Sequence, residues 1–170
     1  GMCIEVAVML ELGFEVALVH VVESSPVTRM IAAASFPMIR FGDSNDVNDT
    51  TVCDQECSFF AGFAGPQCIH WSRLRDSPGG YKEPGSSTFT SCALRLNAER
   101  ARCDMNFALE TVQVHEYLRH DMIRQEKECG VPAQELNANA VGGVAGRNRR
   151  YFVPGVDLSK VERFRHVSPD

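Results

Sequence analysis

The stretch CIEVAVMLELGFEVALVHVV, residues 3–22, decides the fold class because it joins a predicted helix to a predicted strand. Its first half is apolar and ends at Gly13, and glycine is favoured just past the end of a helix. Its second half, residues 14–22, is rich in valine, a residue that β-strands favour. The stretch therefore predicts a helix followed by a strand, with a hairpin of two strands as the alternative.

Helical and strand patterns continue to alternate beyond this stretch. Pro26 suits the first turn of a short helix over 26–35, and a threonine at 50 or 51 can cap a helix over 52–63. A long helix is expected over 98–129, which a break near Asn106 could divide. The remaining predicted elements are strands over 36–41, 67–74, 88–96 and 150–153, and a last helix capped by Asp157. This interleaving indicates an α/β or mixed α+β fold with a central mixed sheet flanked by helices.

The composition is typical of one globular domain, which we place over residues 2–170. The chain has 170 residues, 44% of them apolar, and a chain of this size buries about 70% of its unfolded surface. Its longest apolar runs, 16–22 and 30–34, are far shorter than the ~20 residues of a membrane span. Seven cysteines without the spacing of a disulfide scaffold favour free thiols. We therefore expect a cytoplasmic protein that has no membrane partner.

Charge and loop composition bear on the partners. The net charge is −5, and the one dense basic stretch holds Arg147, Arg149 and Arg150, so nucleic acid is not expected as a partner. A small-molecule substrate or ligand and a homo-oligomer are expected instead. Residues 75–87, rich in proline, glycine and serine, predict a flexible loop, and residues 141–150 a loop rich in glycine and arginine.

The first candidate site is FGDSN, residues 41–45, where an apolar strand meets a polar turn. This block resembles the first motif of the GDSL or SGNH hydrolases, in which the serine after Gly-Asp is the nucleophile. The resemblance implies an ester or acyl hydrolase with Ser44 as nucleophile, beside Asp43. It also implies Asn148, in Gly146-Arg147-Asn148, as the oxyanion donor. His166 or His20 would be the base, and a plain turn capped by these side chains is the alternative.

The same block supports a second enzyme hypothesis. GDSN followed by FAGP, residues 63–66, resembles part of the pattern of the MaoC-type hot-dog hydratases. That resemblance implies Asp43 as a general base. Asn48 stands where that family has a histidine, and an amide cannot take up a proton near neutral pH.

Four thiol and imidazole side chains form a candidate zinc site. Cys53 and Cys57 are spaced to share one face of a helix, and Cys68 and His70 are spaced to share one face of a strand. Together they could supply a tetrahedral Cys₃His set. Ordinary burial of cysteine as a small apolar residue is the alternative, in which no cofactor is bound.

The glycine and arginine loop supports a hypothesis of a different class. Gly143 and Gly146 leave backbone N–H groups approachable, and Arg147 and Arg149 add guanidinium groups, so the loop could hold an anion. The chain would then be a non-catalytic small-molecule or anion-binding oligomeric protein, and a solvated loop is the alternative.

Overall fold

Two pairs of parallel strands organise the structure, a computed structural model that describes residues 3–42, 47–50, 52, 54–137 and 148–160. The first pair, β1 (Val19–Val22) and β2 (Ile39–Gly42), forms a two-stranded sheet. The second sheet has the order β3-β4-β6-β5, and only its β3–β4 pair is parallel. Its strands are β3 (Ala61–Ala64), β4 (Asn106–Val112), β5 (Gln134–Asn137) and β6 (Asn148–Phe152). The predicted mixed α/β fold with a mixed sheet is confirmed.

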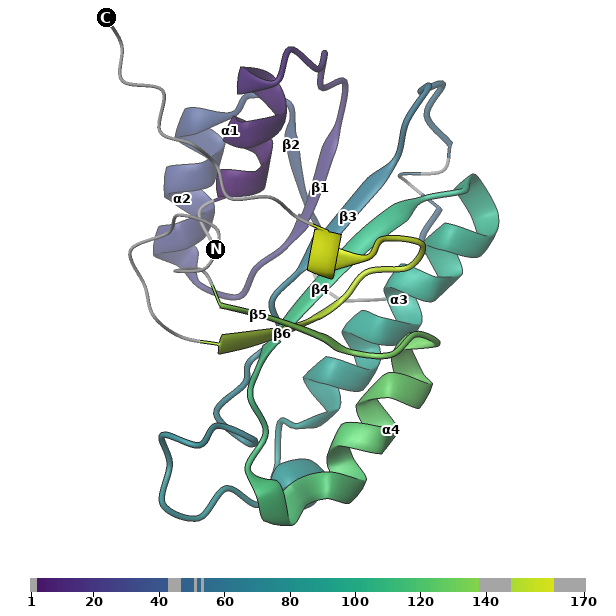
Figure 1. The fold of residues 1–170 in the computed structure, drawn as a ribbon. Coiled ribbons are helices and arrows are strands. Elements are labelled where there is room, and N and C mark those ends of the chain that lie inside the picture. Colours follow the sequence, from purple (N-terminus) through teal and green to yellow (C-terminus); the bar gives the residue numbers. More distant parts are fainter. Residues whose placement is uncertain (1–2, 43–46, 51, 53, 138–147, 161–170) are drawn as a thin grey trace, which may run out of the picture.

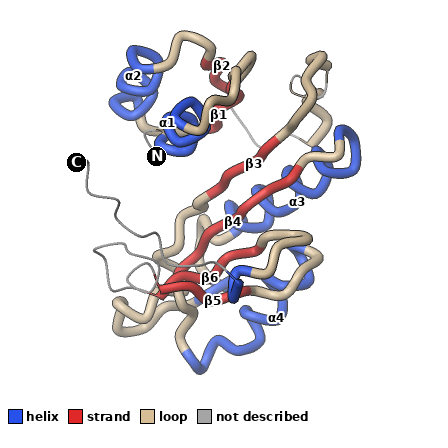
Figure 2. Tube along the Cα trace, turned by 45° about the horizontal axis from the view of Figure 1, so that its top comes forward, coloured by secondary structure: helices blue, strands red, loops and turns tan. Residues whose placement is uncertain are grey.

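The stretch that opens the chain folds as its sequence predicts. Helix α1 (Ile4–Glu11) leads through Gly13 into β1, and α2 (Pro26–Ser35) joins β1 to β2. The Ser25 hydroxyl caps α2 by accepting a hydrogen bond of 3.3 Å from the Thr28 N–H. A small core lies between this helix pair and the first sheet (Figures 1 and 2). Its members are Cys3, Val6, Val19, Val21, Ala32, Phe36, Ile39 and Phe41.

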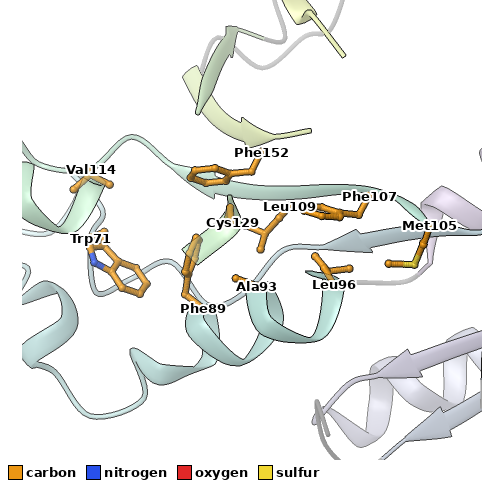
Figure 3. Packing of buried hydrophobic residues seen from close by; sticks show 10 residues of the cluster. All are labelled: Trp71, Phe89, Ala93, Leu96, Met105, Phe107, Leu109, Val114, Cys129 and Phe152. Atoms are coloured by element: carbon orange, nitrogen blue, oxygen red, sulfur yellow. The ribbon is translucent and has the colours of Figure 1, made fainter. Parts of the chain in front are cut away.

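The main core lies between the second sheet and two longer helices, α3 (Ser87–Cys103) and α4 (Arg119–Cys129), which pack against each other. Figure 3 shows Phe89, Ala93 and Leu96 of α3 directed at the strands. Phe107 and Leu109 of β4 meet them, because alternate residues of that strand are buried. Short 3₁₀ turns complete the described chain at Gly80–Lys82, Glu116–Leu118 and Leu158–Lys160.

Two predicted elements in the second half of the chain are wrong. Residues 88–96 form part of α3 and not a strand, because Phe89, Ala93 and Leu96 recur at helical spacing and all three are buried. The predicted single helix over 98–129 is divided among α3, β4 and α4, and the alternative of a break near Asn106 is confirmed, because β4 begins at that residue. A left-handed Asp104, with φ of 51°, ends α3, and the chain turns back into β4.

The predictions between residues 51 and 74 are also wrong. No helix forms over the described part of 52–63, whose end belongs to β3. Residues 67–74 form turns and not a strand, with a single β-bridge between Ser72 and Val114. The tryptophan in this segment explains the turn, because Trp71 is fully buried and draws the chain into the main core. Within the described residues, no helix is long and apolar enough to cross a bilayer.

Candidate functional site

One edge of the second sheet collects the polar groups that could carry chemistry. The carboxyl ends of β3 and β4 lie together there because the two strands are parallel (Figure 1). Strand β6 runs the opposite way, so its first residues reach the same edge, and Arg149 lies opposite Val112. Side chains at the carboxyl ends of parallel strands line the ligand crevice in many α/β proteins. This edge, with the segment 65–72 that follows β3, is the candidate site, and we call it the β3 edge.

Cys68 lies on a tight turn of the β3 edge. The Trp71 N–H donates to the Cys68 carbonyl over 3.1 Å, and the Cys68 side chain is half-buried. Trp71 anchors the turn, because its indole Nε1–H donates to Asp121 Oδ2 of α4 over 3.0 Å. The Trp71 carbonyl also accepts from the His115 N–H over 3.2 Å. The thiol is therefore presented by a turn that is fixed to the main core.

His70, on the same turn, belongs to a charged network. Its Nδ1 lies 3.0 Å from Glu83 Oε2, and the imidazole is only 5% exposed. Arg75 and the Gly79 N–H also donate to the Glu83 carboxylate. Hydrogen bonds from His70, Gly79 and Arg75, in that order of weight, lower the pKa of Glu83 to about 2. Among the described residues His70 Nε2 has no hydrogen-bond partner.

The segment over 75–87 also contacts α4. The Tyr81 N–H donates to Asp121 Oδ2 over 2.8 Å, so that carboxylate oxygen accepts from both Trp71 and Tyr81. Gly80 lies against it with φ of 60°, and a Cβ at this position would overlap the Asp121 carboxylate. The Tyr117 hydroxyl donates to the Pro78 carbonyl over 2.7 Å. The flexibility of this loop stays a prediction. A movement of the loop away from α4 would have to break these hydrogen bonds.

Glu110 and Arg149 face each other across β4 and β6. Glu110 follows Leu109, which pairs with Ala64 at the end of β3, and its Oε1 lies 3.2 Å from Arg149 Nε. Both side chains are partly exposed. Arg150 differs, because it is buried against α4, where it donates to Gln125 and Glu126. The β3 edge thus offers a thiol, a carboxylate and a guanidinium group.

A second polar group lies on the first sheet. His20 of β1 has its Nε2 3.7 Å from Asp49 Oδ2 and packs over Gly42 of β2. It lines a cavity of about 550 Å³ together with residues of β2 and of the segment that follows. Glu23 comes directly after β1 and accepts a hydrogen bond of 2.8 Å from the Ser25 N–H. That backbone hydrogen bond lowers the pKa of Glu23, so its carboxylate is charged at neutral pH.

The structure brings together only some of the predicted site residues. Asn148 pairs with Asn137 at the start of β6, next to Arg149, and His20 lies on the other sheet. Of the four predicted zinc ligands, Cys57, Cys68 and His70 are described, and within the described chain no cluster of three metal-binding side chains occurs. The remaining predicted residues lie outside the described residues: Asp43, Ser44, Cys53, Gly143, Gly146, Arg147 and His166.

Three carboxylates of these sites were not among the predicted site residues. Glu23 comes directly after β1, Glu110 lies on β4 next to the residue that pairs with the end of β3, and Glu83 binds His70. The run VHVVE carries a signal for Glu23, because an acidic residue directly after a valine-rich strand is a frequent ligand of sugar hydroxyls. Glu110 and Glu83 could not be found in this way, because their partners are distant in the sequence.

Comparison with known proteins bears on the fold and corrects the function. No protein-family model matches the chain, and no curated protein does. The fold is similar to that of a DNMT2 triple mutant from Spodoptera frugiperda, with a TM-score of 0.50 and 20% sequence identity. The similarity covers 84% of this chain and 43% of that chain, so this chain spans less than half the length of its neighbour. The predicted serine hydrolase, with its hydratase and non-catalytic alternatives, is therefore wrong, because the fold is similar to that of a methyltransferase structure.

Proposed function

We propose that this chain is part of a methyltransferase and that Cys68 is its nucleophile. The observation that carries the proposal is the position of Cys68 on a fixed turn just beyond the carboxyl end of β3. Of the described cysteines, it is the one that lies in the segment directly after a strand of the second sheet, whereas Cys92, Cys103 and Cys129 lie on α3 and α4. Ligands of α/β folds bind at this end of the strands, and the fold resembles that of a methyltransferase.

A thiol suits methyl transfer to a carbon atom that is a poor nucleophile. The Cys68 thiolate adds to an electron-poor carbon of an unsaturated ring, and the electron pair of the ring double bond moves to the neighbouring carbon. That carbon then takes the methyl group from a sulfonium donor, which leaves as a neutral thioether. A base, such as a water molecule, takes the proton from the methylated carbon, the electron pair of that C–H bond restores the double bond, and the thiolate leaves with the electron pair of the carbon–sulfur bond. The thiol is regenerated, so the reaction is catalytic in Cys68.

The acceptor that fits this chemistry is a pyrimidine base of a nucleic acid. Its ring is electron-poor, and Glu110 and Arg149 offer an acceptor and donors of hydrogen bonds at the same edge. A base must leave its stack to reach such a site, as bases do in other methyltransferases. This proposal replaces the expectation, based on the net charge, that nucleic acid is not a partner.

A methyl donor is implied, and Glu23 fits one. A charged carboxylate directly after a parallel strand is the group that binds ribose hydroxyls in α/β nucleotide sites. Glu23 would therefore hold the ribose of a nucleoside donor such as S-adenosylmethionine, which supplies the electrophilic methyl group. Glu23→Gln should weaken donor binding, since an amide oxygen is a weaker acceptor than a carboxylate.

Transfer of a tritium-labelled methyl group from S-adenosylmethionine to DNA and RNA oligonucleotides tests the proposal. We expect the label to appear in one of the two nucleic acids. The rate of methyl transfer should fall at least a hundredfold in Cys68→Ser. Cys57→Ser is the matched control, because Cys57 is also half-buried but precedes β3. Equal loss in both variants, or no transfer by the parent chain, would count against Cys68 as the nucleophile.

A trapping experiment tests the covalent step directly. In an oligonucleotide whose pyrimidine has fluorine at the carbon to be methylated, no proton can be lost, so the thioether to Cys68 should persist. Mass spectrometry of the digested protein should place the adduct on the peptide that holds Cys68. An adduct on another cysteine would assign the chemistry elsewhere.

A further inference from the structure

We infer that the cavity over β1 and β2 binds a small molecule that carries a carboxylate or phosphate group, held by Arg40 and His20. The two residues are direct partners in the parallel pair, so their side chains lie next to each other on one face of the sheet. The opposite face packs on α1 and α2 through Val19, Val21 and Ile39. This site is separate from the β3 edge and does not depend on methyl transfer.

His20 forms the floor of the cavity. A Cβ at position 42 would lie 2.4 Å from its Nε2, so glycine at that position leaves room for the imidazole to lie over β2. The His20 side chain is 13% exposed, and its buried Nδ1 has no hydrogen-bond partner among the residues that the structure describes. Burial of a nitrogen without a partner is unfavourable, and a bound acceptor or donor would offset that cost. The floor is therefore a polar surface that is ready to bind a ligand.

Arg40 supplies a guanidinium group to the cavity lining. Its Nη1 donates to the Ile39 carbonyl over 3.1 Å, and it forms no ion pair within the described part of the chain. The acidic residue of the cavity is already engaged, because Asp49 lies 3.7 Å from His20 and 4.0 Å from Arg95 of α3. The cavity lining therefore holds one guanidinium group without an ion-pair partner among the described residues, and one carboxylate that already contacts other side chains. A guanidinium group binds the two oxygens of a carboxylate or phosphate in parallel.

The size and the remaining walls define the ligand further. A volume of about 550 Å³ lies within the range of small-molecule sites. Ala17 and Leu18 provide an apolar wall, and Gln55 adds an amide. The ligand class is therefore a small organic acid or phosphate ester with an apolar portion. Inorganic phosphate and benzoate represent the two oxyanions.

Calorimetric titration of the whole chain with each of these two probes, without any methyl donor, tests the inference. We expect binding of at least one probe, and affinity at least tenfold lower in Arg40→Gln and in His20→Gln. Arg119→Gln is the matched control, because it removes the same charge at an exposed position on α4. Tighter binding of phosphate would assign a phosphate ester, and tighter binding of benzoate a carboxylic acid.

Three outcomes would overturn the inference. These are no binding of either probe at millimolar concentration, unchanged affinity in Arg40→Gln, and an equal loss in Arg40→Gln and Arg119→Gln. Arg40→Lys keeps the charge but loses the paired hydrogen-bond donors, so its affinity for the probe should lie between those of the parent chain and Arg40→Gln. Thermal unfolding of each variant without probe confirms that it is folded. Since no donor or nucleic acid is present, failure here leaves the role of Cys68 untouched.

Discussion

Trp71 and Asp121 are joined by a hydrogen bond of 3.0 Å that ties the turn after β3 to the first turn of α4. The same carboxylate oxygen accepts from the Tyr81 N–H. One side chain therefore holds two points of the segment that joins β3 to α3. The residues that present Cys68 are thus fixed by a contact some fifty positions away in the chain.

Loss of this carboxylate should destabilise the fold. Asp121→Ala leaves the buried indole N–H without an acceptor, so we expect the free energy of unfolding to fall by about 2 kcal/mol. Asp121→Asn keeps an acceptor oxygen and should lose less than half of that. Urea denaturation measures the free energy of unfolding of both variants, and Asp76→Ala, at an exposed position, is the control. A change in Asp121→Ala no larger than in the control would show that the contact contributes little.

Gly80 and Gly130 form a matched pair for a test of crowding. Both have a positive φ, 60° and 69°, but a Cβ at Gly80 would overlap the Asp121 carboxylate, whereas nothing lies within 4 Å at Gly130. Alanine at Gly130 should cost about 1 kcal/mol for the left-handed backbone alone. Alanine at Gly80 should cost clearly more, because Asp121 must also move. Equal midpoints of thermal unfolding for the two variants would contradict this explanation.

Glu83 should make stability depend on pH in the acid range. Its pKa is about 2 in the folded chain, against 4.5 for the ordinary group, because it accepts hydrogen bonds from His70, Gly79 and Arg75. A lowered pKa stabilises the fold above pH 4.5, and this stabilisation is lost as the pH falls from about 4.5 to 2.

Glu83→Gln should flatten that dependence, and Glu116→Gln, at an exposed position, should leave it unchanged. Urea midpoints at pH 6 and pH 3 give the comparison. If the parent and Glu83→Gln lose stability in parallel over this range, the charged network around His70 is not its source.

Cysteine reactivity should separate Cys68 from Cys129. Burial raises the pKa of the Cys129 thiol to about 12, so almost no thiolate forms there at pH 8. Cys68 is half-buried on a turn and should be accessible to iodoacetamide. Peptide mass spectrometry after brief labelling of the folded chain should therefore find Cys68 modified well before Cys129. The order should disappear in urea, and early labelling of Cys129 in the folded chain would contradict its burial.

The first forty residues could be predicted from sequence because their signals are local. Gly13 ends α1, Ser25 and Pro26 begin α2, and valine-rich β1 lies between them. In α3, by contrast, Phe89, Ala93 and Leu96 fit a helical period while TFTSCALRL also alternates, and only packing against β4 decides between the two. Strand β3 has four residues, which is too short for a periodic signal.

The candidate site was harder to predict than the fold. FGDSN resembles a known sequence block, whereas Cys68 lies in a segment whose alternation predicts a strand and which forms turns instead. Its relation to Glu110 and Arg149 arises from the order of β3, β4 and β6 in the sheet. That order brings together residues more than forty positions apart, so no local pattern could reveal it.

The buried indole that anchors the turn has a practical consequence. Trp71 is the single tryptophan of the chain, and it lies three residues after Cys68 with its ring in the main core. All of the tryptophan fluorescence of this protein therefore comes from one fluorophore beside the β3 edge. Nucleic acid bound at Cys68 could be followed by intrinsic emission alone, without a label, and a red shift would report release of the indole from Asp121 into water.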